Sequence, residues 1–86
     1  MCAMGKVASC EISFIPIESD DYTADVNRVL EIIKSYNLEH TVGPLSTSII
    51  GEESRIFYLI RDIYDSMSEV CRFKMDIKIS NICGCG

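Results

Sequence analysis

The chain has 86 residues, of which 48% are hydrophobic, and its net charge is −5. This length and composition predict one globular domain over residues 1–86, with residues 1–6 and 82–86 as flexible ends. The negative charge argues against nucleic-acid binding, which needs a basic surface. Since we find neither a membrane span nor a convincing signal peptide, we expect a cytoplasmic protein without membrane insertion.

The first predicted element is a strand from Val7 to Ile17, where apolar and polar residues alternate. Its apolar side carries Ala8, Cys10, Ile12 and Phe14, and its more polar side carries Ser9, Glu11, Ser13 and Ile15. Pro16 cannot donate a hydrogen bond to a neighbouring strand, so we expect the strand to end there.

Residues 18–38 follow with apolar side chains at steps of three and four, which predicts a helix. Its stripe consists of Tyr22, Val26, Val29, Leu30 and Ile33, continued by Tyr36 or Asn37. Ser19, Asp20 and Asp21 supply a cap and negative charge at its start. Asn37 suits the left-handed conformation in which many helices end.

Residues 39–51 read as two short strands joined near Gly43 and Pro44, and a second helix follows over 52–70, beginning at Glu52 or Ser54. Its stripe is Ile56, Ile60, Ile63, Tyr64 and Met67, widened by Phe57 and Leu59. The last element, 71–80, alternates as a strand, with Phe73, Met75, Ile77 and Ile79 on its apolar face.

The order strand–helix–strand–strand–helix–strand predicts an α+β, ferredoxin-like βαββαβ fold. The four strands form an antiparallel sheet of order 4-1-3-2, with two helices on one face. Ser13, at the end of the first strand, then lies beside the start of the third strand near Thr47. We expect Glu11, Ser13 and Asp76 on the open face, and the register decides whether Thr47 or Ser48 joins them.

No pattern in the chain indicates an enzyme. We find neither a nucleophile–base pair nor a glycine-rich phosphate loop, so we predict no catalytic residues and no cofactor. Cys83 and Cys85 suggest a metal site or a disulfide. However, His40 is the only histidine and no second cysteine pair exists, so a flexible tail without metal is favoured. The pattern alone also favours a solvated open face, or one packed on a second copy, over a ligand site.

Three segments resemble the YkoF-type thiamine-binding family. They are "SCEISFIPIESDDY" (9–22), "GPLSTSIIG" (43–51) and "MDIKISNICGCG" (75–86). The most specific features are the S-x-x-P pattern at 13–16 and the hairpin pattern "LST…G" that ends at Gly51. The shorter branch of the family usually reads G-P-M-G-T in this hairpin, so Ser46 stands in place of a glycine here.

The resemblance implies non-enzymatic binding of thiamine or its hydroxymethylpyrimidine moiety, by a carrier or sensor linked to thiamine uptake and salvage. Ser13 and Thr47 match the family's strand serine and hairpin threonine. Hydroxyls suit the donors and acceptors of an aminopyrimidine, and a carboxylate suits its amine or the thiazolium charge. The full predicted ligand-binding set is Ser13, Thr47, Glu11, Ser46, Ser48 and Asp76.

Two further expectations concern aromatic stacking on the ligand and the oligomeric state of the chain. Phe14 or Phe57 is a candidate to stack on the ligand ring, although a plain core role is favoured for both. Because YkoF-branch proteins often carry two such domains in one chain, this single domain is expected to form a homodimer or homotetramer. The hypothesis requires the hydroxyls of Ser13 and Thr47 to share one hollow. If they lie on opposite faces of the sheet, or if a neighbouring subunit fills the hollow, the small-molecule carrier hypothesis fails.

Two alternatives share this topology. One is a structural or interaction module that oligomerises and has no ligand, in which protein side chains fill the space beside Ser13 and Thr47. The other is an RRM-type nucleic-acid module, which needs exposed aromatic residues on the central strands. Ser9, Glu11 and Ser13 occupy those positions, so the RRM alternative is disfavoured.

Overall fold

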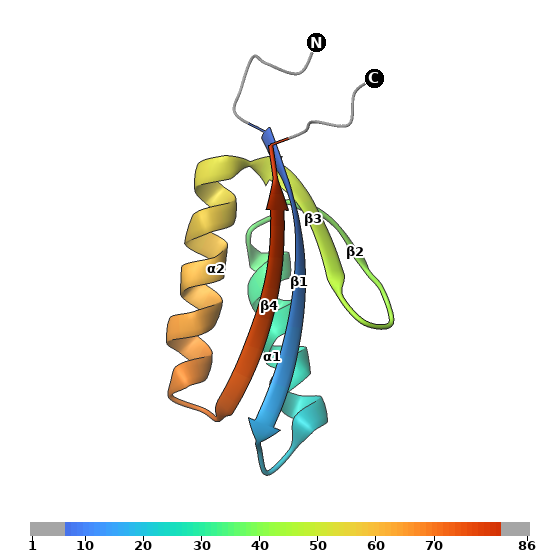
Figure 1. The fold of residues 1–86 in the computed structure, drawn as a ribbon. Helices are drawn as coiled ribbons and strands as arrows, with labels where there is room; N and C mark the ends of the chain where they lie inside the picture. The colour runs from blue at the N-terminus through green and yellow to red at the C-terminus, as the bar shows by residue number, and fades with distance from the viewer. Residues whose placement is uncertain (1–6, 82–86) are drawn as a thin grey trace.

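The computed structural model describes residues 7–81 and confirms the predicted fold. The elements are β1 (Val7–Glu18), α1 (Tyr22–Ser35), β2 (Glu39–Val42), β3 (Thr47–Glu52), α2 (Glu53–Ser68) and β4 (Arg72–Ser80). The strands form one antiparallel sheet of order β2-β3-β1-β4, and both helices pack on one face (Figure 1). The predicted ends, 1–6 and 82–86, lie outside the described residues, as do Cys83 and Cys85.

The core lies between the sheet and the helices. The alternation in β1 turns its even-numbered residues toward α1 and α2, as predicted. The fully or nearly fully buried side chains are Ala8, Cys10, Ile12, Val29, Ile33, Ile49, Ile56, Leu59, Ile63 and Met67. At about 25 cal/mol per Å² of buried apolar surface, these residues provide most of the driving force for folding. None of the helices among residues 7–81 has the length and apolar character to cross a membrane.

The ends of the helices follow the capping signals. Asp21 is the N-cap of α1, and its Oδ1 accepts a hydrogen bond of 3.1 Å from the Ala24 amide. Asn37 has φ of 54°, the left-handed conformation expected after the helix. Glu52 precedes α2, which settles the choice between Glu52 and Ser54, although its side chain makes no capping hydrogen bond.

The helical stripes differ from the prediction at their edges. Tyr22, Phe57 and Tyr64 are more than half exposed. Asp25 is buried in α1 instead, where its carboxylate accepts a hydrogen bond from the Ser19 hydroxyl. Leu59, predicted only to widen the stripe of α2, is completely buried. Sequence spacing fixes the period of a stripe, but not where a sheet of finite width stops covering it.

The prediction that the first strand ends at Pro16 is wrong. β1 runs to Glu18, pairing with β4 through Pro16–Phe73 and, after a register shift, Glu18–Arg72. β3 pairs with β1 only as far as Ile12, so that edge of β1 is unpaired at Pro16. A residue without an N–H is tolerated in a strand beside such an edge.

Candidate functional site

The open face of the sheet carries cross-strand rows of mainly polar residues. One row contains Ile50, Ser9 and Ser80, because Ser9 pairs with both of the others. The next row contains Ser48, Glu11 and Lys78, again through direct pairing. Because directly paired residues share a face of a sheet, these six side chains form one surface.

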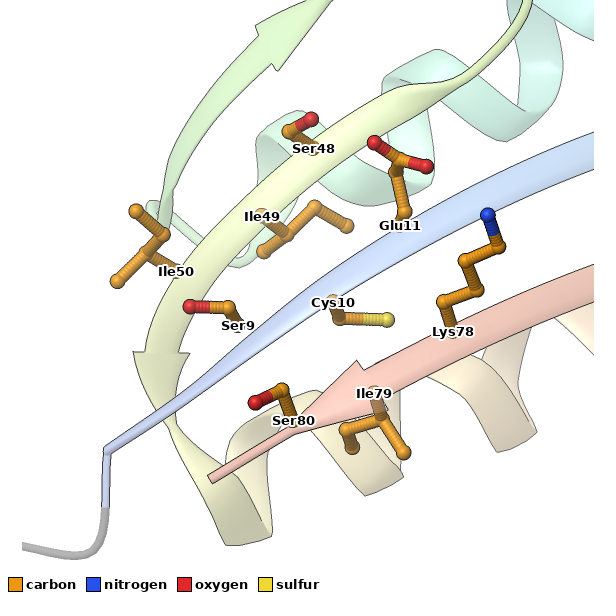
Figure 2. Close-up of a pocket in the computed structure, with 9 residues that line it drawn as sticks. All are labelled: Ser9, Cys10, Glu11, Ser48, Ile49, Ile50, Lys78, Ile79 and Ser80. Carbon is orange, nitrogen blue, oxygen red and sulfur yellow. The ribbon is translucent and has the colours of Figure 1, made fainter. Parts of the chain in front are cut away.

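A shallow hollow of about 430 Å³ lies over these two rows. We call it the open-face hollow, and its side chains on the open face are Ser9, Glu11, Ser48, Ile50, Lys78 and Ser80. Figure 2 shows Glu11 between Ser48 and Lys78. Glu11 and Lys78 are cross-strand neighbours, yet the ion pairs among residues 7–81 do not include them. The Glu11 carboxylate is exposed and could accept hydrogen bonds from a cationic or amino-bearing ligand.

Ser13 and Asp76 pair with each other one row further along the open face. They do not line the open-face hollow. The Ser13 hydroxyl donates a 2.9 Å hydrogen bond to the carbonyl of Leu45, in the loop between β2 and β3. Ser13 therefore ties this loop to the middle of β1.

The prediction that Ser13 and Thr47 share one hollow is wrong. Thr47 pairs with Ile12, which places it on the helix-covered face, whereas Ser13 is on the open face. The register therefore selects Ser48, and not Thr47, for the open face. A shift of one residue would have given the opposite result, because side chains alternate along a strand.

Thr47 instead lines a second cavity of about 210 Å³, between α1 and the β2–β3 hairpin. We call it the helix-side cleft. Its lining consists of Ile12, Phe14, Val26, Val29, Leu30, Ile33, Val42, Gly43, Pro44, Leu45, Ser46 and Thr47. An apolar lining with a few hydroxyls is the usual composition of a small-molecule site. The structure thus divides the six predicted ligand-binding residues among the open-face hollow, the helix-side cleft and the Ser13–Asp76 row.

The Thr47 hydroxyl is distinctive within the helix-side cleft. Thr47 is only 7% exposed, and no residue of 7–81 forms a hydrogen bond with its side chain. No side-chain oxygen in this part of the chain is both unpartnered and fully sealed from solvent. The Thr47 oxygen therefore keeps contact with the solvent in the cleft, where it can act as donor or acceptor for a ligand.

The sequence did not indicate the apolar wall of this cleft. Val26 and Leu30 come from α1, and Val42 comes from the end of β2. The signal available was the edge of the α1 stripe, where the sheet no longer covers the helix. Phe14, one of the two stacking candidates, lines the cleft, whereas Phe57 is exposed on α2.

The two cysteines among residues 7–81, Cys10 and Cys71, both have a raised pKa. Burial raises the pKa of Cys10 above its ordinary value, and the neighbouring Glu11 charge adds to the effect. Burial likewise raises the pKa of Cys71, with Asp25 contributing. Thiols with raised pKa stay protonated at neutral pH and are poor nucleophiles and metal ligands. Residues 7–81 contain no cluster of three or more histidine, cysteine, aspartate or glutamate side chains suited to a metal.

The comparisons with known proteins agree with the observed fold. The family model described as a thiamine-binding protein matches residues 10–82. No curated protein matches the chain. Among solved structures, a Thermotoga maritima protein provisionally assigned to thiamine biosynthesis or salvage is 22% identical, with a TM-score of 0.78. The match covers 86% of this chain and 82% of that one.

Two further structures share the fold. A domain of unknown function from Bacillus cereus is 18% identical over 100% of this chain and 86% of its own, with a TM-score of 0.81. A hypothetical protein from Methanocaldococcus jannascii is 21% identical over 87% of this chain and 79% of its own, with a TM-score of 0.76. At these identities the structures show the fold alone. The family match over residues 10–82 shows that the chain belongs to the thiamine-binding protein family.

Proposed function

We propose that this chain is a cytoplasmic, non-enzymatic binder of thiamine or its hydroxymethylpyrimidine moiety, acting as a carrier or sensor in thiamine uptake or salvage. Membership of the thiamine-binding protein family supports the ligand class. The observation that carries the proposal is the Thr47 hydroxyl, which is nine-tenths buried, has no hydrogen-bond partner among residues 7–81 and borders an apolar cleft.

The helix-side cleft suits the pyrimidine part of the ligand. A flat heteroaromatic ring can lie against the apolar side chains and beside the Phe14 ring, which supplies dispersion and stacking. The hydroxyls of Thr47 and Ser46 can serve as donor or acceptor for the ring nitrogens and the exocyclic amine. Both hydroxyls sit on a strand or a short loop held by the sheet, so little conformational entropy is lost on binding.

The open-face hollow is the competing location. Glu11 and Ser48 offer a carboxylate and a hydroxyl side by side, which suits an amine or a thiazolium cation. However, the hollow is shallow and lies on an exposed sheet face, where hydrogen bonds and charges compete with water. We therefore place the pyrimidine in the helix-side cleft. Ser13 and Asp76 lie away from that cleft, and we assign them no ligand contact.

Isothermal titration calorimetry with thiamine, hydroxymethylpyrimidine and thiamine monophosphate tests the ligand class. We expect heat of binding and thermal stabilisation with at least one of them, because binding to the folded state alone raises stability. The absence of both effects at millimolar concentrations of all three compounds would rule out the proposed function.

The location is tested by one substitution at each cavity. Thr47→Val removes the hydroxyl of the cleft, and Glu11→Gln removes the charge of the open-face hollow. We expect the first to weaken binding and the second to leave it nearly unchanged. The reverse result would keep the binding function and move the ligand to the open face.

A further inference from the structure

The helix-side cleft has an exposed leucine at its mouth. Leu45 lines this cleft and is 87% exposed, which makes it the most exposed of the large hydrophobic residues within 7–81. Val42, which also lines the cleft, is 52% exposed. A single exposed leucine is ordinary on a protein surface. At the opening of an apolar cavity, however, its side chain is one that an entering ligand can cover.

The backbone that carries this side chain is held in place. The Leu45 carbonyl accepts a 2.9 Å hydrogen bond from the Ser13 hydroxyl. Within the loop, the Gly43 amide donates a 2.8 Å hydrogen bond to the Ser46 carbonyl. The ring of Pro44 restricts the backbone further, because it fixes φ. With the backbone held at the cleft, the Leu45 side chain can respond to a ligand by rotating about its own bonds.

The lining of the cleft shows what such a rotation would achieve. None of the lining residues is charged, and the one nearly buried hydroxyl among them belongs to Thr47, which is 7% exposed. A hydrogen bond between this hydroxyl and a ligand competes with water while the mouth stays open. An apolar side chain across the mouth would exclude that water and strengthen the bond, because the local dielectric constant falls.

We propose that Leu45 is the lid of the helix-side cleft: its side chain turns over the bound pyrimidine ring and shields the Thr47 hydroxyl from water. Exposed side chains change rotamer within picoseconds to nanoseconds, so the closure requires no movement of the backbone. Ser13 is then a positioning residue, which acts on the cleft from the open face through the Leu45 carbonyl. The inference rests on the proposed function, since it adds a ligand contact to the same cleft.

Calorimetric titration of the full chain tests the contact, with hydroxymethylpyrimidine, or with thiamine if only thiamine gives heat with the wild type. Leu45→Ala should raise Kd about tenfold and make the heat-capacity change of binding less negative, because less apolar surface is buried. Leu45→Met keeps a flexible apolar side chain and should bind nearly as well as the wild type. Ile17→Ala, the control, removes a side chain that is 57% exposed and outside the cleft, and should leave Kd unchanged.

A double-variant cycle tests the shielding of Thr47. In the Leu45→Ala background, Thr47→Val should weaken binding by a smaller factor than in the wild type, because water already competes for the hydroxyl there. Additive effects of the two substitutions would overturn the shielding. The unfolding midpoint of Leu45→Ala without ligand should equal that of the wild type, since the side chain is exposed.

Methyl NMR locates the side chain in the complex. The chain has four leucines, of which Leu30 and Leu45 line the cleft, whereas Leu59 is completely buried in the core. We expect nuclear Overhauser effects from the ligand to the methyl groups of Leu30 and Leu45, and none to those of Leu59. Contacts with Leu30 alone would keep the ligand in the cleft and overturn the lid.

Two further results would overturn the lid while the proposed function stands. One is a Kd of Leu45→Ala equal to that of the wild type. The other is a change in the sedimentation mass of Leu45→Ala, which would assign the side chain to an interface between copies of the chain. A wild type that binds neither compound would overturn the proposed function, and the lid with it.

Discussion

Thr47 lies directly opposite Ile12 in the β1–β3 ladder, and this pairing turns its side chain toward the helices and away from Ser13. Two hydroxyls that are close along neighbouring strands thus serve different purposes. Ser13 holds the hairpin loop by its bond to the Leu45 carbonyl. Thr47 borders the helix-side cleft and has no partner among residues 7–81, so it is available to a ligand.

We expect Thr47→Val to weaken binding of hydroxymethylpyrimidine or thiamine by about 1–3 kcal/mol, roughly 5- to 150-fold in Kd, because a ligand polar group would be left unpaired. Valine preserves the shape, so stability should change little. Calorimetric titration gives the affinity, and Thr41→Val is the matched control, since Thr41 is exposed on the opposite face. Equal affinities of the two variants would contradict the assignment of Thr47.

Removing the hydroxyl of Ser13 should loosen the hairpin loop. Ser13→Ala deletes the bond to the Leu45 carbonyl and should cost about 0.5–1.5 kcal/mol of the free energy of unfolding. Amide hydrogen exchange over residues 43–46 should become faster. Ser48→Ala removes an exposed hydroxyl with no partner among residues 7–81 and should change neither quantity. Unchanged exchange in Ser13→Ala would show that the bond does not hold the loop.

The Leu38 side chain occupies the space that a Cβ at residue 51 would take. A Cβ added at residue 51 would lie 2.7 Å from Leu38 Cδ2. Gly51→Ala should therefore destabilise the fold by about 0.5–1.5 kcal/mol, since the end of the Leu38 side chain must leave its preferred rotamer. Combining it with Leu38→Ala should cost less than the sum of the two single changes, measured by urea unfolding. Val70→Ala, in the turn that follows α2, should combine additively with Gly51→Ala. Additivity of the Gly51 and Leu38 changes would rule out the contact as the cause.

Stability should fall at alkaline pH because the folded chain raises the pKa of two thiols, the buried Cys10 and the partly buried Cys71. Burial raises the pKa of Cys10 in the folded state above its ordinary value of 9.0, so the unfolded thiol ionises first. The contribution of Cys10 to stability is then complete below that value and is lost as the pH rises through the folded-state pKa. Cys71 acts in the same direction.

Urea unfolding midpoints from neutral pH to about pH 10 measure this loss. Cys10→Ala should be less stable at neutral pH, because it leaves a cavity, but should lose less stability between the two pH values. A midpoint that is constant or rises with pH in the wild type would contradict the expected ionisation.

The strand faces could be read from the sequence because a period of two admits only two assignments. Ala8, Cys10 and Ile12 had to lie on one side, and Ser9, Glu11 and Ser13 on the other. The order of strands followed from short connections and the helices between them. The positions of Asp21 and Asn37 at the ends of α1 also followed from local capping chemistry, which does not depend on the rest of the fold.

The site was harder to predict because it depends on how strands meet. The choice between Thr47 and Ser48 rests on a one-residue register, which the hairpin loop and the packing of Ile49 decide together. The burial of Asp25 depends on Ser19, which becomes its neighbour only after the chain turns into α1. The helix-side cleft is formed by α1 and the β2–β3 hairpin. Its width depends on how these two elements pack, which cannot be read from the sequence.

The loop of residues 43–46 closes one end of the helix-side cleft, yet it contributes no residue to the sheet. Ile49 anchors β3 in the core independently of the loop, with its side chain completely buried. Insertions or exchanges between Gly43 and Ser46 would therefore reshape the mouth of the cleft while the scaffold stays in place. In this architecture, the size of molecule that the cleft admits can therefore change during evolution without a loss of folding stability.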